Sequence, residues 1–218
     1  MKQISAEDMR RMLKLYFIMG SVNCRLTPEE TLTQAIAGGI TIFQFREKGP
    51  GALRSNAAYD LARQLQAICR EHGIPFIVND DVELAIALDA DGVHVGQEDE
   101  PAGSIRQRLG AHKIVGVSAH SLAEAQQAIA DGADYLGIGP VYPTSSKDDA
   151  QAVQGTQVIE QLRRNGLTIP LVGIGGITAG NVPPVIQAGA DGVSVISAIA
   201  AAGDIRAAAQ QLLDATLI

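Results

Sequence analysis

The sequence predicts a (β/α)8 barrel, in which eight parallel strands close into a ring that helices surround. Short apolar runs alternate with longer segments of helical period along the 218 residues, which is typical of βα units that feed a parallel sheet. Four stretches, AGGITIFQF, LDADGVHVG, ADGADYLGIG and QAGADGVSVI, repeat a helix end, a small or acidic turn and a strand, roughly 40 to 60 residues apart, or about two βα units. A doubly wound sheet is the alternative, because periodicity does not show closure.

The strands of this barrel are expected where the sequence has short runs rich in β-branched or aromatic residues. These runs cover residues 15–19, 40–46, 75–79, 92–95, 113–117, 134–138, 169–174 and 191–196. Each run is followed by a segment long enough for a crossover helix, as a parallel sheet requires.

Helices are expected between the strands, and the end signals are clearest for two of them. Helix 28–38 has Thr27 as its N-cap and Glu30 in position for a capping box. Helix 51–72 stops before Gly73, a common C-terminal residue. Further helices are expected at 82–88 and 154–165, and an extra N-terminal helix at 5–13 is placed to close the bottom of the barrel.

Composition and charge restrict the function classes. With 46% hydrophobic residues, the chain is expected to form a single domain over residues 1–218. A formal charge of −7 and a pI near 5.0 argue against a nucleic-acid partner. Cys24 and Cys69 are expected to be reduced thiols, and the apolar run 15–19 is too short for a membrane segment. We therefore expect a cytoplasmic protein without a membrane partner.

Polar residues gather where the strands end, which is where barrels carry function. After the second strand, Gln44, Arg46 and Lys48 alternate with other residues, so strand geometry puts these three on one face. Two cations and an amide would then face the mouth together and attract an anion. A solvated charge cluster is the alternative for this stretch.

Acidic residues follow the third and fourth strands, at Asn79–Asp81 and Gln97–Asp99. Carboxylates from two strand ends can share Mg²⁺, which takes one or two carboxylates, waters and substrate phosphates. Aspartate is also a favoured N-cap. We expect Asp81 to cap the helix that follows, while Asp80 points at the ligand.

The later strand ends carry hydroxyls, a lysine and glycines. GPVYPTSSK at 139–147 follows the sixth strand and suits an anion, although a polar turn is the alternative. GIGGIT at 173–178 lets main-chain amides approach a phosphate. His120, after the fifth strand, is either a base or a structural residue. Two anion sites are expected, one for a diphosphate and one for a monophosphate.

Seven motifs in this order resemble the thiamine phosphate synthase family over nearly the whole chain: QFREK, VNDD, HVGQED, VSAH, GPVYPTSSK, GIGGI and ADGVSVISAI. The resemblance implies a transferase of thiamine biosynthesis with a (β/α)8 fold. It would join 4-amino-2-methyl-5-(diphosphooxymethyl)pyrimidine to a thiazole phosphate, giving thiamine phosphate and diphosphate, with Mg²⁺ as cofactor.

The resemblance also implies a role for individual residues. The pyrimidine diphosphate site would comprise Gln44, Phe45, Arg46, Glu47, Lys48, Asn79, Ser118 and Lys147. The thiazole phosphate site would comprise Thr144, Ser145, Ser146, Gly176, Ile196 and Ser197. The metal ligands would be Asp80 and Asp99, and the catalytic residues Arg46, Lys48, Ser118 and Lys147. Ser146 departs from the family, which often has threonine there, but keeps the hydroxyl.

In the family the diphosphate is thought to leave first and the thiazole nitrogen then captures the carbocation, so no covalent nucleophile is needed. Two alternatives stay open: a thiazole tautomerase, for which His120 would be the proton shuttle, and a non-catalytic protein that binds thiazole or thiamine phosphate. Residues 143–155 are the candidate lid. The sequence leaves the oligomeric state open, including a homo-oligomer.

Overall fold

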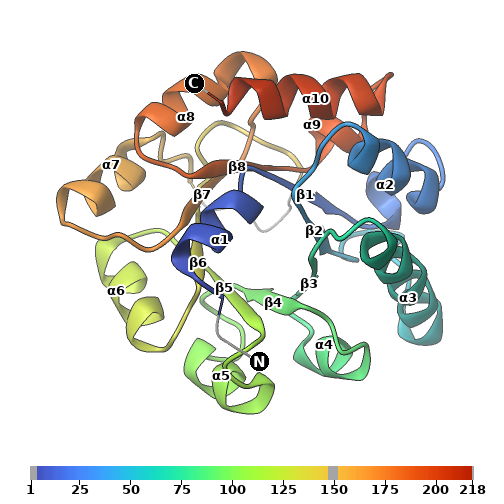
Figure 1. Cartoon of the computed structure of the whole chain (residues 1–218), viewed down its shortest axis with the longest axis horizontal. Helices are drawn as coiled ribbons and strands as arrows, with labels where there is room; N and C mark the ends of the chain where they lie inside the picture. The colour runs from blue at the N-terminus through green and yellow to red at the C-terminus, as the bar shows by residue number, and fades with distance from the viewer. Residues whose placement is uncertain (1–3, 147–151, 218) are drawn as a thin grey trace.

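The computed structural model describes residues 4–146 and 152–217, and it forms a closed barrel of eight parallel strands in chain order (Figure 1). The strands are β1 Leu15–Met19, β2 Ile42–Phe45, β3 Phe76–Asn79, β4 Gly92–Val95, β5 Ile114–Ala119, β6 Tyr135–Ile138, β7 Leu171–Ile174 and β8 Gly192–Val195. The ring closes because β1 pairs with β8, with Leu15 opposite Val193. The barrel prediction is confirmed, and the doubly wound alternative is wrong.

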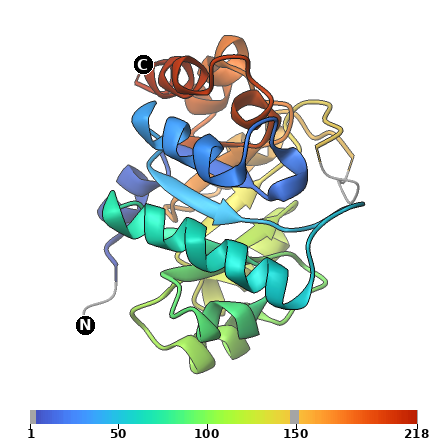
Figure 2. The same ribbon diagram turned by 90° about the vertical axis from the view of Figure 1, so that its right-hand side faces the viewer.

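Helices surround the strands and cover the outside of the ring (Figures 1 and 2). They are α1 Ala6–Met12, α2 Pro28–Ala37, α3 Ser55–Glu71, α4 Val82–Ala87, α5 Ala102–Leu109, α6 Leu122–Ala130, α7 Gln157–Arg164, α8 Val182–Gln187, α9 Ser197–Ala200 and α10 Ile205–Ala215, with short 3₁₀ turns at Ser21–Asn23 and Ala179–Asn181. Apolar side chains of the strands and helices form the outer core between the two layers.

The extra N-terminal helix α1 lies across one end of the barrel (Figure 1). Its Met9 is 1% exposed, and Leu13 just after it is fully buried. Both belong to the inner cluster that includes Tyr16, Ile42 and Ile114. Burial of these side chains keeps water out of the ring, so α1 closes the bottom as expected, and the opposite end, where the strands terminate, remains as the mouth.

The N-cap and the capping box predicted for α2 are confirmed, and the predicted start of α3 is wrong. Thr27 Oγ1 accepts a hydrogen bond from the N–H of Glu30 at 3.2 Å, and the Glu30 carboxylate accepts one from the N–H of Thr27 at 3.3 Å. Helix α3, however, begins at Ser55 and not at residue 51. Gly51 has φ +84°, a left-handed conformation that a right-handed helix excludes.

Two arginines at the bottom rim repeat one pattern of hydrogen bonds. Arg106 binds the Asp134 carboxylate at 2.5 Å, and Arg163 binds the Asp191 carboxylate at 2.8 Å. Each guanidinium also donates to three main-chain carbonyls of nearby turns. The two aspartates lie in the echoed stretches ADGADYLGIG and QAGADGVSVI, so this repeated clamp is one physical reason for the echo.

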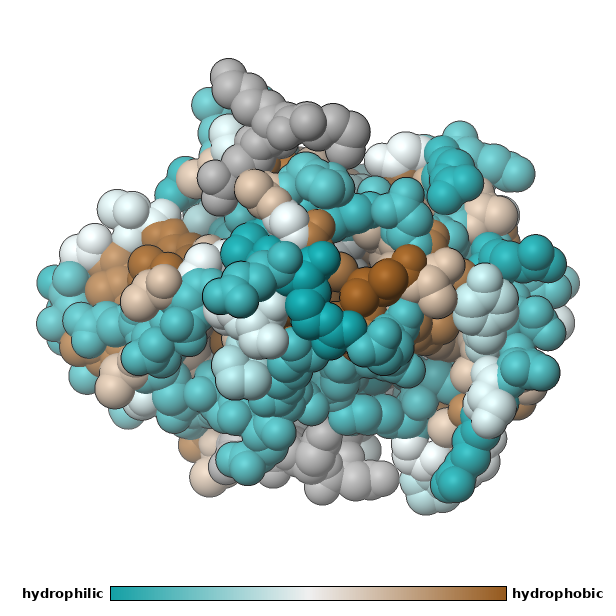
Figure 3. Space-filling model, turned by 90° about the horizontal axis from the view of Figure 1, so that it is seen from below, coloured by the Kyte–Doolittle hydropathy of each residue, from teal (hydrophilic) through white to brown (hydrophobic). Residues whose placement is uncertain are grey.

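The surface seen in Figure 3 is mostly hydrophilic, and hydrophobic residues appear on it as separate patches. Within the described part of the chain, no helix has the length and apolar character needed to span a bilayer. Cys24 and Cys69 are both free thiols, as expected.

Candidate active site

The mouth of the barrel contains two adjoining cavities. The larger has a volume of about 480 Å³ and the smaller about 340 Å³. Thr144, Ile174 and Gly175 line both, so the two are neighbours with a shared wall. A pair of ligands held in them would meet at this wall.

The larger cavity collects polar residues from several strand ends. Four of the residues expected for a pyrimidine diphosphate line it, namely Arg46, Lys48, Asn79 and Ser118. Arg46 follows β2, Asn79 ends β3, and Ser118 lies on β5. Asn79 Nδ2 is buried, and no acceptor for it exists among residues 4–146 and 152–217. A buried donor without a partner is unfavourable, so this amide suits a ligand acceptor.

Asp80 and Asp99 line the same cavity, and their carboxyl groups interact directly. Asp80 has φ +61°, an uncommon conformation for a residue other than glycine, and its N–H donates to the carbonyl of His94 at 2.8 Å. Burial raises the pKa of Asp80; an ion-paired hydrogen bond from Lys48 opposes the rise, and Asp99 adds to it. The site therefore holds two carboxylates close together in a poorly solvated place.

Asp80 and Asp99 fit a Mg²⁺ site in which a bound substrate supplies further ligands. Within the described residues no group of three or more His, Cys, Asp or Glu side chains could hold a metal by itself. Mg²⁺ needs only one or two carboxylates when waters and phosphate oxygens fill the other positions. Asp99 is already oriented, because one of its oxygens accepts from the N–H of Gly96 at 2.8 Å. The donor set is compatible with Mg²⁺ bound together with a phosphorylated ligand.

Three residues of the QFREK stretch use their side chains elsewhere. Gln44 is 1% exposed and donates to the Tyr16 hydroxyl inside the barrel. Phe45 belongs to the outer core. Glu47 accepts from the N–H and hydroxyl of Ser21 at 2.7 and 2.5 Å and from the N–H of Leu53 at 2.8 Å. Phe45 and Glu47 therefore have only main-chain groups left for a ligand.

All six residues expected around a thiazole phosphate line the smaller cavity: Thr144, Ser145, Ser146, Gly176, Ile196 and Ser197. The hydroxyls of Ser146 and Ser197 are 3.0 Å apart, which ties the loop after β6 to the start of α9. Gly176 has φ +62°, and a Cβ there would lie 2.4 Å from the carbonyl oxygen of Pro143. Glycine is therefore required for this loop to approach so closely.

His94 is a cavity residue that the sequence predictions missed. It lies on β4, is 8% exposed, and contacts the Tyr135 hydroxyl through Nδ1 and the Ser118 hydroxyl through Nε2, each at 2.9 Å. In the strand GVHV the valines face the outer core, so the alternation of a strand directs His94 inward. The sequence signal for His94 was therefore a single polar residue at an inward-facing position of an apolar strand.

His120 also lines the larger cavity, with Nδ1 3.0 Å from the Glu124 carboxylate. Gln154 Nε2 donates a hydrogen bond to the main-chain carbonyl of His120 at 3.2 Å. Lys147 lies outside the described residues, as does the central part of the candidate lid, residues 147–151.

The family model described as thiamine monophosphate synthase matches residues 15–199. Thiamine-phosphate synthase of Geobacillus kaustophilus is 58% identical over 215 residues, covering 99% of this chain and 97% of the relative. The Geobacillus thermodenitrificans enzyme of the same name is 59% identical, with the same coverage.

Solved structures give the same result. The thiamine phosphate pyrophosphorylase of Pyrococcus furiosus has a TM-score of 0.83 and 36% identity, with coverage of 95% of this chain and 97% of that one. A 3-hexulose-6-phosphate synthase, at 20% identity and a TM-score of 0.66, shares the fold. The family match and the high identity over almost the full length show that this chain belongs to the thiamine monophosphate synthase family.

Proposed function

We propose that the chain is a thiamine phosphate synthase, which transfers the hydroxymethylpyrimidine group from its diphosphate to 4-methyl-5-(2-phosphooxyethyl)thiazole and releases diphosphate. One observation carries the proposal beyond family membership. A cavity with two cations and a carboxylate pair adjoins a cavity that is lined by several hydroxyl side chains and a close-packed glycine. Two phosphorylated reactants of different charge fit this arrangement.

The departing diphosphate needs positive charge that is already in place, since preorganised charge is the main way in which an enzyme stabilises a leaving anion. Arg46 and Lys48 are the described cations of the larger cavity, and Lys147 is a further cation in the proposal. Mg²⁺, held by Asp80 and Asp99, would neutralise part of the diphosphate charge when bound. Lys48 already pairs with Asp80, so it stands beside the proposed metal site.

The remaining residues would bind and orient the two reactants. Asn79 Nδ2 offers a buried donor, and Ser118 a hydroxyl, to the pyrimidine diphosphate. Hydroxyls of Thr144, Ser146 and Ser197 would hold the thiazole phosphate from the other cavity. Holding the nucleophile and the reacting carbon together accounts for a large share of the rate in such reactions, and neither free cysteine lines these cavities.

The test is diphosphate release with both substrates and with each one omitted. Release that requires both, together with formation of thiamine phosphate, is the expected result. Lys147→Ala should lower turnover by about 100- to 1000-fold, as loss of one preorganised donor does, and should leave thiazole phosphate binding nearly unchanged. Absence of thiamine phosphate would contradict the proposal and would favour a protein that only binds these compounds.

The tautomerase alternative is not favoured by the family and the relatives. His120→Ala separates the two reactions, since a tautomerase needs a proton shuttle at the reacting atoms. We expect a modest loss of diphosphate release, because the proposed transfer needs no general base. Near-total loss in a folded variant would overturn that mechanism. The cytoplasmic location and a homo-oligomeric state stay predictions.

A further inference from the structure

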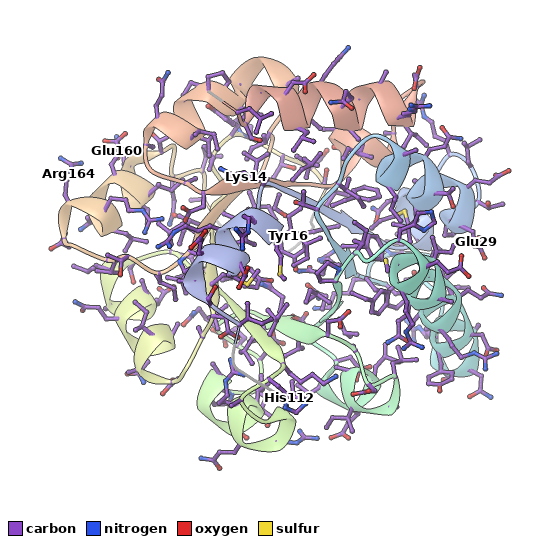
Figure 4. The ribbon with its side chains drawn as sticks, viewed as in Figure 1. Lys14, Tyr16, Glu29, His112, Glu160 and Arg164 are labelled. Carbon is purple, nitrogen blue, oxygen red and sulfur yellow. The ribbon has the colours of Figure 1, made fainter. Side chains whose placement is uncertain are left out.

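A chain of hydrogen bonds crosses the interior of the barrel from β2 to β5. Gln44 Nε2 donates to the Tyr16 hydroxyl at 2.8 Å, and that hydroxyl is 2.8 Å from the hydroxyl of Tyr135. The Tyr135 hydroxyl is 2.9 Å from His94 Nδ1, and His94 Nε2 is 2.9 Å from Ser118 Oγ. Figure 4 shows Tyr16 within the ring of strands. The five side chains come from five different strands and end at the larger cavity.

The middle of this chain is dry. Tyr16 is 1% exposed and Tyr135 is fully buried, so water has no access to either hydroxyl. Burial raises the pKa of both phenols, which keeps each hydroxyl protonated. Each tyrosine therefore has one proton to donate, and a buried hydroxyl needs an acceptor for that proton.

The direction of the chain follows from the donor at its first end. An amide nitrogen only donates, so Tyr16 accepts from Gln44. Within the described part of the chain, Tyr135 is the partner left for the Tyr16 proton. Tyr135 then donates to His94 Nδ1, which must be unprotonated, and the ring proton lies on Nε2. Nε2–H donates to Ser118 Oγ, so the Ser118 hydroxyl keeps its own proton for the cavity.

We propose that this chain fixes the tautomer of His94 and thereby makes Ser118 a hydrogen-bond donor to the pyrimidine ring of the substrate. A pyrimidine ring nitrogen accepts hydrogen bonds and does not donate them, so a hydroxyl held as a donor is complementary to it. Tyr16, Tyr135 and His94 are then positioning residues that act through Ser118. The inference rests on the proposed function for the identity of the ligand, but the tautomer is a property of the protein alone.

The tautomer is measured by two-bond ¹H–¹⁵N correlation spectra of the full chain labelled with ¹⁵N-histidine. Four histidines are present, and the signals missing from His94→Gln identify His94. The expected spectrum has an unprotonated Nδ1 and a protonated Nε2, and Tyr135→Phe should change this pattern. A proton on Nδ1 in the unmodified protein would overturn the proposal, because the chain would then run the other way.

Steady-state kinetics separate positioning from damage to the fold. Tyr135→Phe should lower kcat/KM for the pyrimidine diphosphate about tenfold, the effect expected from one buried hydrogen bond, and leave KM for the thiazole phosphate unchanged. Tyr59→Phe on the exposed face of α3 is the matched control and should behave as the unmodified chain.

A double variant tests whether the tyrosines act as one chain. The double variant Tyr16→Phe with Tyr135→Phe should lose no more kcat/KM than Tyr135→Phe alone. Once Tyr135 has lost its hydroxyl, the bond between Tyr16 and Tyr135 no longer exists, so removing the Tyr16 hydroxyl has no further effect on His94. Losses that multiply would overturn the proposal. If the unmodified chain forms no thiamine phosphate, the proposed function fails, and the spectra still decide the tautomer.

Discussion

At the bottom rim, Asp134 and Asp191 each accept a hydrogen bond from a partly buried arginine and another from the N–H of a strand, Val115 or Leu171, at 2.8 Å. At the mouth, Asp80 lies in a strained backbone conformation against a second carboxylate, Asp99, with a partly exposed lysine as its cation. The first set has every partner that a buried carboxylate needs. The second set places two carboxylates beside each other with one ion-paired lysine.

The difference separates residues that hold the barrel together from residues that would bind its ligands. Partners supplied by the fold make a carboxylate stabilising, since a buried charge without them is strongly unfavourable. Carboxylates that repel each other in the free protein have the most to gain from a cation. Aspartates of the same barrel should therefore respond to mutation in opposite ways, and four predictions test this, from the largest effect to the smallest.

The largest effect is expected for activity at the mouth. Asp80→Ala and Asp99→Ala should each reduce Mg²⁺-dependent turnover by about 1000-fold or more, because metal neutralisation of a leaving diphosphate is worth several kcal/mol. Both should stay folded, since the residues line a cavity and not the core. Assays with both substrates measure this, with the exposed Asp60→Ala as control. Full turnover in either variant would remove that residue from the metal site.

At the bottom rim the effect should be on stability. Asp134→Asn should lower the free energy of unfolding by about 3 kcal/mol, because it leaves the guanidinium of Arg106 without its carboxylate. Turnover per folded molecule should not change. Urea unfolding at 25 °C measures the loss. A loss below about 0.5 kcal/mol would mean that the ion pair between Asp134 and Arg106 contributes little to stability. The carboxylates of the bottom rim would then not be more stabilising than those of the mouth.

Asp81 lies beside Asp80 in the sequence but has the role of a helix cap. Its carboxylate accepts from the N–H of Leu84 at 2.9 Å, as predicted. Asp81→Ala should lower the free energy of unfolding by about 0.5 to 2 kcal/mol and reduce turnover far less than Asp80→Ala. If the turnover of both variants falls equally, the division between these neighbours is wrong.

The smallest effect is a pH dependence in the metal-free protein. Because the pKa of Asp80 is raised on folding, the folded chain holds a proton that the unfolded chain has released. Stability then falls as pH rises from the ordinary pKa of 3.8 through the raised value, because the folded state binds more protons there. Urea unfolding in chelator across this interval should show the slope, and Asp80→Asn should flatten it. An unchanged slope in Asp80→Asn would contradict the assignment.

The sequence predicted the parts of the molecule that depend on local patterns. Short runs rich in β-branched or aromatic residues located all eight strands, and the Thr27 and Asp81 caps followed from residue types at helix starts. The start of α3 was wrong, because the left-handed conformation of Gly51 is set by its loop and not by helix propensity.

The site was predictable where its residues occur in order at strand ends, as for Asp80 and Thr144. The interior chain was not, because Tyr16 and Tyr135 are 119 residues apart and meet only when the barrel closes. Each reads as an ordinary core aromatic in its own strand. Glu47 was expected at the ligand, yet its carboxylate binds Ser21 and Leu53, contacts that no local pattern indicates.

The most direct test of the contrast between the two rims is the free energy of unfolding of Asp80→Asn in chelator at pH 7, compared with the unmodified chain. Asparagine tolerates the left-handed backbone and removes a charge that is disfavoured beside Asp99. The free energy of unfolding should rise by about 0.5 kcal/mol or more, in the range of other changes that remove unfavourable charge. A loss as large as that of Asp134→Asn would show that the mouth carboxylate stabilises the fold, and would contradict the account.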